Sequence, residues 1–199
     1  HRDLHRLIRR QRQMCIRDRC KRLLQISSSF TYSVSFTTRP PRKNEIEGVD
    51  YYFISRKEFQ EMIKQKKFVE WAQVHGELYG TSTDLLDKAI ETKKDVVLEV
   101  DVEGGIKIKK RYPEAVLIFL LPPSWQELEK RLHKRATEGV EKIRERINQA
   151  KREITYAPSY DYLVVNDNIN RALDDVLSIV KAERCRINRI SLKDLKEFI

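Results

Sequence analysis

The chain has 199 residues, of which 40% are hydrophobic, a length that suits one ordinary core and leaves little room for a second domain. The longest apolar run, residues 115–121, is far shorter than the roughly 20 residues that a helix needs to cross a bilayer, so we expect no contact with a membrane. Three scattered cysteines exclude a disulfide framework and indicate a reducing, cytoplasmic setting: Cys15, Cys20 and Cys185.

The formal net charge of +10 is unevenly distributed. Residues 1–24 hold nine Lys or Arg against two Asp, a surplus of seven, which leaves +3 for the rest of the chain. A body of such modest charge suits a few small phosphates better than a nucleic-acid track, and basic residues are not interleaved with stacking aromatics. We therefore expect no nucleic-acid partner; binding through the basic start is the alternative that residues 1–24 leave open.

The first 21 residues contain no glycine and no clear apolar period. They lack the apolar centre of a secretory signal, although an Arg-rich, acid-poor start leaves a targeting interpretation open.

Residues 33–51, SVSFTTRPPRKNEIEGVDY, concentrate chemistry in one stretch. Pro40 and Pro41 stiffen the backbone between Arg39 and Arg42, so that two guanidinium groups project from one rigid loop. Such forks hold phosphate oxygens bidentately. Short basic runs are usually just solvated surface, and this loop taken alone would favour that interpretation.

Strands are expected at residues 30–35, 50–55 and 68–74. Ser55 and Glu58 have the spacing of a capping box, which predicts that a helix begins there with Phe59 on its inner face. A further short helix is expected over residues 84–92.

Residues 96–101, VVLEVD, predict a strand buried on both faces, with Glu99 and Asp101 on the same side of it. Gly104 and Gly105 then open a helix that runs through Tyr112, and residues 116–121 form the next buried strand. This alternation of strand and helix predicts a parallel α/β sheet flanked by helices.

The last third continues the alternation. Ser124 and Glu127 form a second capping box that begins a helix. A helix over residues 140–156, a strand over 162–165 and a helix over 170–186 follow, and residues 187–199 carry no motif.

Together the motifs resemble one family. The pattern S-x-S-x-T-T-R-x-P-R, then G-x-D-Y, E-W-A, Y-G-T, and a strand that ends in Asp with a Gly three residues on, is similar to guanylate kinase. The resemblance covers residues 22–186 in the family's order and spacing. It implies a P-loop NTPase-like α/β fold with an inserted GMP-binding lobe at about residues 35–82 and a helical lid at about 125–156.

The resemblance also implies site residues. Glu70 and Asp101 would accept hydrogen bonds from the N–H groups of guanine, and the hydroxyls of Ser35 and Thr81 would interact with its carbonyl side. The GMP phosphate would be held by four side chains: Arg39, Arg42, Tyr51 and Tyr79. Arg135 and Arg146 match the lid arginines and, with Arg39, would act in catalysis; Arg135 and Asn168 would contact ATP. Mg²⁺ is expected with ATP, and no residue is assigned as a metal ligand.

One part of the family pattern is missing. The 199 residues contain no G-x-x-x-x-G-K-[ST] loop, whose amides cradle ATP phosphates. We interpret residues 1–21 as a foreign segment joined near Lys21, and expect a guanylate kinase that is impaired in this chain. The alternative is a non-catalytic guanylate kinase-like module that binds GMP or a phosphopeptide.

Overall fold

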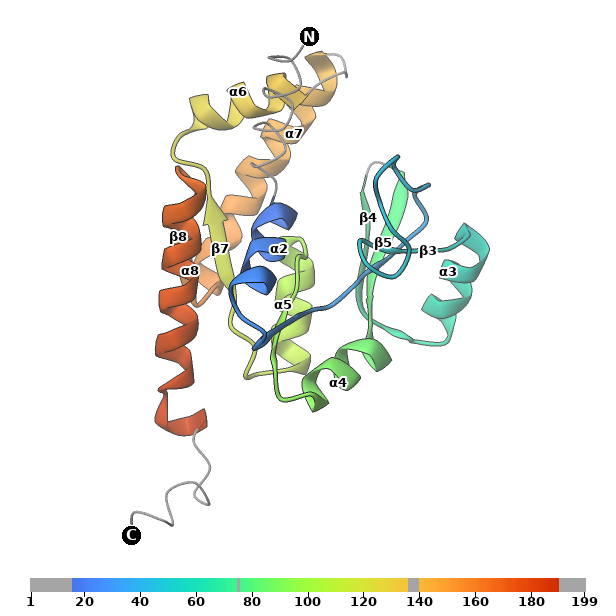
Figure 1. The fold of residues 1–199 in the computed structure, drawn as a ribbon. Coiled ribbons are helices and arrows are strands. Elements are labelled where there is room, and N and C mark those ends of the chain that lie inside the picture. The colour runs from blue at the N-terminus through green and yellow to red at the C-terminus, as the bar shows by residue number, and fades with distance from the viewer. Residues whose placement is uncertain (1–15, 75, 136–139, 190–199) are drawn as a thin grey trace. The chain divides into compact units, whose positions relative to one another are not determined.

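The computed structural model describes residues 16–74, 76–135 and 140–189 (Figure 1). The chain divides into two compact units, His1–Ala115 and Val116–Ile199. The N-terminal segment 1–15 and the tail beyond residue 189 lie outside the described residues, so the predictions made for them stay predictions.

The first unit contains a parallel pair of short strands, β1 (Phe30–Tyr32) and β6 (Asp95–Val97). Helix α2 (Ile16–Ile26) contacts β1 and buries Cys20 and Leu23. The helix runs without interruption through Lys21, the predicted junction.

The strand predicted over residues 96–101 is wrong in its extent, because β6 ends at Val97. The backbone carbonyl of Val97 accepts from the Ser33 amide at 3.0 Å, and beyond it the ladder stops. Among the described residues β1 is the one strand paired with β6. Extended residues become a strand only where a neighbour pairs with them, so the apolar pattern alone overestimated the length.

A four-stranded sheet forms the second part of this unit, in the order β3-β2-β5-β4. The strands are β2 (Phe36–Thr37), β3 (Tyr52–Phe53), β4 (Phe68–Val74) and β5 (Glu77–Ser82). β5 pairs antiparallel with both β2 and β4, whereas β2 and β3 are parallel. The predicted strand over residues 68–74 is confirmed to the residue; the one expected over 50–55 is reduced to two residues.

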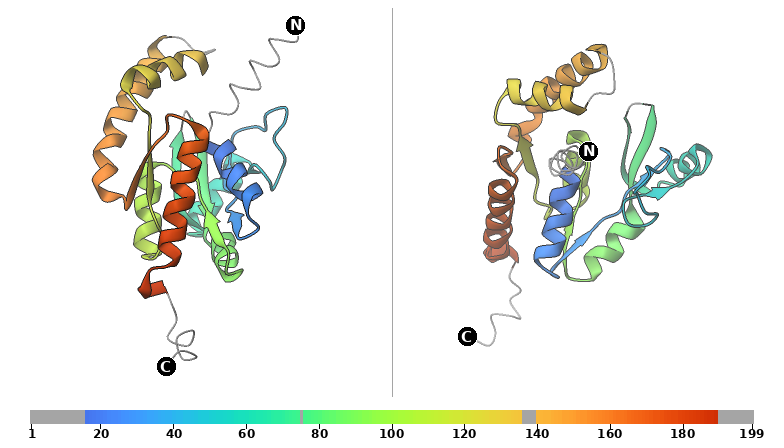
Figure 2. Two further views of the ribbon diagram at one scale, coloured as in Figure 1. Left: turned by 60° about the vertical axis from the view of Figure 1, so that its left-hand side comes forward. Right: turned by 45° about the horizontal axis from the view of Figure 1, so that its top comes forward.

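Helix α3 (Arg56–Lys64) lies beside this sheet (Figure 2). The capping box predicted at its start is present, with Ser55 and Glu58 bonded reciprocally. Phe59 is fully buried and its ring stacks on Phe68 at 4.4 Å between centroids. A Cβ at Gly80 would come within 2.9 Å of the Phe68 ring, so this aromatic packing requires a glycine there.

Two more helices complete the unit: α4 (Thr83–Glu91) and α5 (Val102–Arg111). Helix α4 contacts β5 and β6, and α5 contacts β4. The contact between α5 and β4 joins the start of α5 to the four-stranded sheet, which matters for the site.

The second unit contains the parallel pair β7 (Ile118–Leu121) and β8 (Tyr162–Val165). Its helices are α6 (Trp125–Arg135), α7 (Val140–Glu153), η1 (Ile154–Ser159), α8 (Ile169–Arg184) and η2 (Ile187–Arg189). Helix α8 contacts β8 (Figure 1). The chain is therefore a mixed α/β protein with parallel strand pairs and flanking helices, as predicted. The helix expected to reach residue 156 ends at Glu153, where η1 takes over.

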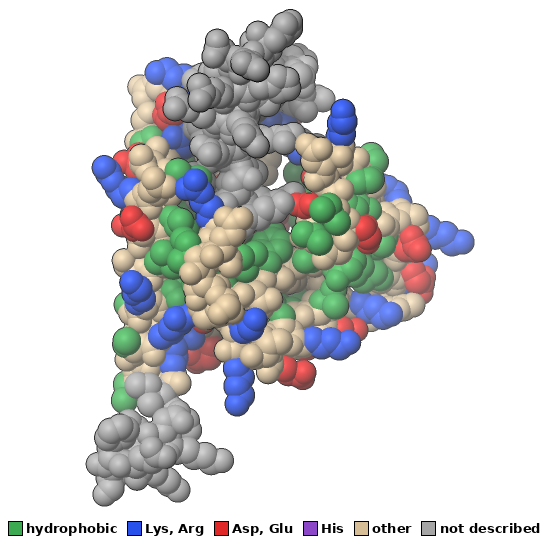
Figure 3. Space-filling model, viewed as in Figure 1, with side chains coloured by type: hydrophobic (Ala, Val, Ile, Leu, Met, Phe, Trp, Pro, Cys, Tyr) green, Lys and Arg blue, Asp and Glu red, His purple; other side chains and the backbone are tan. Residues whose placement is uncertain are grey.

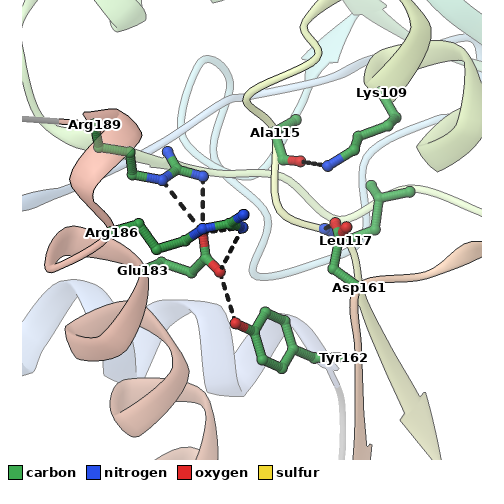
Figure 4. Close-up of polar contacts among 8 residues, drawn as sticks. All are labelled: Lys109, Ala115, Leu117, Asp161, Tyr162, Glu183, Arg186 and Arg189. Atoms are coloured by element: carbon green, nitrogen blue, oxygen red, sulfur yellow. Dashed lines mark hydrogen bonds and ion pairs between the residues drawn. The ribbon is translucent and has the colours of Figure 1, made fainter.

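A buried carboxylate joins β8, α8 and η2 (Figure 4). Glu183 accepts from the Tyr162 hydroxyl at 2.6 Å and from Arg189 Nη2 at 2.9 Å, and lies 3.3 Å from Arg186 Nη1. The hydrogen bond from Tyr162 lowers the pKa of Glu183. Burial acts in the opposite direction, and the hydrogen bond from Arg189 adds to the lowering. This cluster holds the end of the second unit together.

On the face shown in Figure 3, Lys and Arg side chains are scattered around the described surface. In the part of the chain that the structure describes, none of the helices combines the length and apolarity needed to cross a membrane.

Candidate functional site

The pairing of β4, β5 and β2 sets three polar residues in a row. Glu70 on β4 lies opposite Thr81 on β5. The β2–β5 register pairs Phe36 with Gly80, so Ser35, one residue earlier, lies beside Thr81 in that register. Side chains alternate along β5, which places Thr81 on the sheet face opposite the aromatic packing around Gly80. On β4 the register shifts between Phe68 and Glu70, and this irregularity pairs Glu70 with Thr81.

Glu70 is a buried carboxylate, only 7% exposed. Its Oε1 accepts from the Thr81 hydroxyl at 2.5 Å, and Thr81 is itself 1% exposed. Burial raises the pKa of Glu70, and the charge of Asp101 adds to the rise, while the Thr81 bond and Lys107 oppose it. Glu70 is thus held in place by a neutral hydroxyl, and among the described residues Lys107 opposes the raised pKa only through its charge. A carboxylate in this environment is a candidate for accepting hydrogen bonds from a ligand.

Asp101 is the N-cap of α5, and its Oδ1 accepts from the Gly104 amide at 2.7 Å. Because α5 contacts β4, this cap is carried to the neighbourhood of Glu70. The two carboxylates that we predicted as partners are brought together from β4 and from the N-cap of α5. We refer to Glu70 and Asp101 as the carboxylate pair.

Residues 39–51, the arginine loop, hold a second cluster. Arg39 Nη2 donates to both carboxylate oxygens of Glu45, at 2.8 and 2.9 Å, and the two side chains are only 14% and 12% exposed. Glu45 also accepts from the Arg42 backbone amide at 2.8 Å. The chain itself therefore supplies the anion that occupies the Arg39 fork.

Aromatic rings surround the Arg39 fork. Its Cζ lies 5.5 Å from the centroid of the Tyr51 ring, and the Tyr51 and Tyr79 rings meet edge to face at 5.8 Å. Burial opposes the charge on Arg39, but bonds to Glu45 and Tyr79 outweigh it and raise the pKa of the guanidinium. Three of the four predicted phosphate residues, Arg39, Tyr51 and Tyr79, are therefore adjacent.

The fourth predicted phosphate residue, Arg42, is exposed on the arginine loop. The loop is held by its own backbone: Asp50, 4% exposed, accepts from the Ile46 amide at 2.9 Å. Gly48 has φ of 72°, a left-handed conformation that favours glycine, and its amide bonds to the Tyr51 carbonyl. The loop is thus ordered without depending on the Arg42 side chain.

The predicted lid and ATP residues belong to the second unit. Arg146 is half-buried on α7, and Arg135 is the last residue of α6, with its side chain outside the described part. Asn168 is the N-cap of α8, where its Oδ1 accepts from the Asn170 and Arg171 amides at 2.8 and 3.3 Å. Their roles toward a nucleotide stay predictions.

The sequence matches the guanylate kinase family model over residues 17–183. The chain belongs to the guanylate kinase family. A guanylate kinase of Desulfitobacterium hafniense is 47% identical over 170 residues, 85% of each chain. One from Clostridium tetani is 44% identical over 171 residues, 86% of this chain and 82% of that one.

A solved relative agrees. The crystal structure of guanylate kinase from Anaplasma phagocytophilum has a TM-score of 0.75 and 32% identity, and covers 90% of this chain and 88% of that one. The resemblance inferred from the motifs is confirmed, and with it membership of a family of phosphotransferases.

Two residues that contact the predicted site residues were assigned no role from the sequence. Glu45 looked like one more surface charge, although an acid three residues after Arg42 was a signal that the basic loop has an internal partner. Gly104 was part of the family motif, as the Gly three residues after Asp101, but it was given no role, whereas its amide fixes Asp101.

Within the described residues, no group of three or more His, Cys, Asp or Glu side chains is placed to hold a metal ion. Mg²⁺ in phosphoryl-transfer enzymes is bound largely by substrate phosphates with one or two protein carboxylates, so a preformed cluster is not required for it.

Proposed function

We propose that this chain binds GMP on its four-stranded sheet and, as a guanylate kinase, transfers the terminal phosphoryl group of ATP to it. The observation that carries the proposal is the carboxylate pair: Glu70, buried and fixed by Thr81, beside the Asp101 cap.

Guanine presents two adjacent N–H donor groups and a carbonyl on its pairing edge. Glu70 and Asp101 each use one oxygen within the protein, Oε1 toward Thr81 and Oδ1 toward Gly104. Each keeps a second oxygen for a ligand donor. The Ser35 hydroxyl would donate to the carbonyl side, whereas the buried Thr81 hydroxyl, which we also predicted there, already donates its one proton to Glu70. Adenine lacks this pattern and would leave the buried Glu70 facing no donor, at a cost of about 1 to 3 kcal/mol.

The GMP phosphate would enter the cluster around Arg39. A phosphate dianion there would share or replace Glu45 on the fork, with the Tyr51 and Tyr79 hydroxyls and the exposed Arg42 as further donors. The internal Arg39–Glu45 pair keeps the guanidinium in place before the ligand arrives, which reduces the entropy lost on binding.

Phosphoryl transfer depends mainly on positioning and on cations around the transferred group. In this proposal Arg39, Arg135 and Arg146 supply that charge, and closure of residues 125–156 excludes water, so that GMP receives the phosphoryl group. Arg135 and Asn168 would contact ATP. We infer that Mg²⁺ arrives bound to the ATP phosphates, where it neutralises their charge, and that the protein works in the cytoplasm.

The chain as written should be a slow kinase, because no segment replaces the missing glycine-rich loop. Its amides and lysine would contribute several transition-state contacts of about 2 to 4 kcal/mol each, so we expect turnover at least roughly a thousandfold lower. The assay is coupled ADP release by this chain, beside a version in which residues 1–21 are replaced by an apolar strand and a GxxxxGKS loop. Equal turnover by the two would contradict the proposal.

That same missing loop favours one second candidate, a guanylate kinase-like module that binds GMP or a phosphopeptide without catalysis. Inactivity of the repaired chain together with intact GMP binding would select it.

Nucleotide selectivity tests the binding step directly. Titration calorimetry should show GMP bound at least roughly tenfold more tightly than AMP, from one unsatisfied buried acceptor. Equal affinity for the two nucleotides would remove the guanine assignment whatever the kinase rate.

A further inference from the structure

The first turn of α5 passes very close to both members of the carboxylate pair. A Cβ built on Gly104 would lie 3.0 Å from Asp101 Oδ1 and 3.0 Å from Glu70 Oε2, with the Glu70 carboxyl carbon at 3.3 Å. Gly104 and Glu70 are buried, and Asp101 is half-buried. The space beside the Gly104 Cα is therefore bounded by two carboxylates, that of Glu70 on β4 and that of Asp101 before α5.

Neither carboxylate can easily retreat. Glu70 is held through Oε1 by Thr81, which leaves Oε2 as the oxygen nearest to Gly104. Asp101 is held through Oδ1 by the Gly104 amide itself. A methyl group at residue 104 would have to shift one carboxylate or weaken the bond that fixes it, because contacts this close exceed ordinary van der Waals packing.

The helix gives no other reason for a glycine. Gly104 is not among the glycines with left-handed backbone, which are Gly48 and Gly76. Glycine inside a helix is less favourable than alanine. Space, rather than backbone conformation, is what the structure requires at this residue.

We propose that Gly104 is a specificity-determining residue: the absence of a side chain sets the positions of Glu70 and Asp101, so that both face the N–H groups of one guanine. The proposal rests on the guanine site proposed above and adds to it the residue that sets its geometry. It predicts that a single methyl group at this residue lowers selectivity for GMP without unfolding the chain.

The test is Gly104→Ala, assayed by titration calorimetry with GMP and AMP and by thermal melting. We expect GMP affinity to fall roughly tenfold to a hundredfold, the value of one hydrogen bond to a charged group, with AMP affinity unchanged. The melting temperature should not fall by a comparable amount, because alanine favours the helix. Lys110→Ala, exposed on the same helix, is the matched control and should change neither.

A rescue separates positioning from general damage. Glu70→Asp shortens that side chain by one methylene, so the double variant Gly104→Ala/Glu70→Asp has room for the added methyl. The two changes should be non-additive, with the double variant losing less GMP affinity than the sum of the single losses. Additive losses would overturn the inference.

Three further outcomes are decisive. If Glu70→Gln loses the preference for GMP while Gly104→Ala keeps it, the guanine site stands and the role of Gly104 is wrong. If Glu70→Gln keeps the preference, the guanine site itself is wrong. Should Gly104→Ala melt without a cooperative transition, the double variant decides: it must fold and prefer GMP, and no preference overturns the inference.

Discussion

The carboxylate pair and the arginine loop are two charged regions of the proposed GMP site, and their charges are paired in opposite ways. Glu70 is buried, and among the described residues its hydrogen-bond partner is the neutral hydroxyl of Thr81, which is almost completely inaccessible. Arg39 forms an ion pair with Glu45, and Arg42, on the same loop, is exposed. In the carboxylate pair, Glu70 is hydrogen-bonded to a neutral hydroxyl, whereas Arg39 in the arginine loop already forms an ion pair with Glu45.

We expect this difference to give the two regions different roles: the carboxylate pair selects the base, and the arginine loop attracts the phosphate. A buried acceptor is costly unless the right donor arrives, so it discriminates between bases. Arg39 is already paired, so it gains less from any one anion, and the exposed Arg42 is open to solvent and salt. We therefore expect these cations to hold phosphate without identifying the nucleotide. Four measurements test this division, from the largest expected effect to the smallest.

Removal of the loop cations should have the largest effect on GMP. Arg39→Ala and Arg42→Ala should each weaken GMP binding by about 1.5 to 3 kcal/mol, because a charge-assisted contact to phosphate is lost, and should leave guanosine nearly unaffected. Calorimetry with the nucleotide and the nucleoside measures the difference. An equal proportional loss for both ligands would indicate damage to the fold instead.

The charge on Glu70 should make the unliganded protein less stable as the pH rises. Its folded-state pKa is raised by burial and by Asp101, so the fold favours the protonated form, and stability is lost between the ordinary value of 4.5 and the raised one. Glu70→Gln should therefore stabilise the unliganded chain at neutral pH by an amount on the order of 1 kcal/mol.

Thermal melting from pH 4 to pH 8 measures that effect. The advantage of Glu70→Gln should vanish at the acid end and stay constant above the raised pKa. GMP affinity of the native chain should rise over the same interval, since an ionised Glu70 accepts hydrogen bonds from the N–H groups of guanine. An advantage independent of pH would show that the charge is not its cause.

Salt should distinguish the two regions without any mutation. Raising KCl from low to physiological concentration and beyond should weaken GMP binding several-fold, while guanosine binding changes little. The exposed Arg42 is screened over a Debye length of about 8 to 10 Å, whereas the buried Glu70 is screened much less. Identical salt dependence for the two ligands would break the comparison.

Changes in stability alone should not affect the site. Lys66 and Lys93 follow α3 and α4 with φ of 54° and 58°, where a lysine is strained. Lys66→Gly and Lys93→Gly should each stabilise the fold by about 0.5 kcal/mol, with GMP affinity unchanged. Melting and calorimetry on the same samples check both statements, and altered affinity would link the scaffold to selectivity.

Local features were readable from the sequence because they depend on neighbours in the chain. The Ser55–Glu58 capping box and the strand over residues 68–74 are where we predicted them. The order and spacing of the motifs identified Glu70, Thr81 and Asp101. The sequence pattern does not predict the contact between β4 and α5.

Pairing and proximity were decided only by the tertiary structure. Strand β6 stops at Val97 because a strand lasts only as long as its hydrogen-bonding neighbour, which the apolar run over residues 96–101 does not specify. Glu45 became part of the site because a loop folds it back onto Arg39. Gly104 matters because β4 brings Glu70 within 3.0 Å of where its side chain would begin, a distance set by packing between segments thirty-four positions apart.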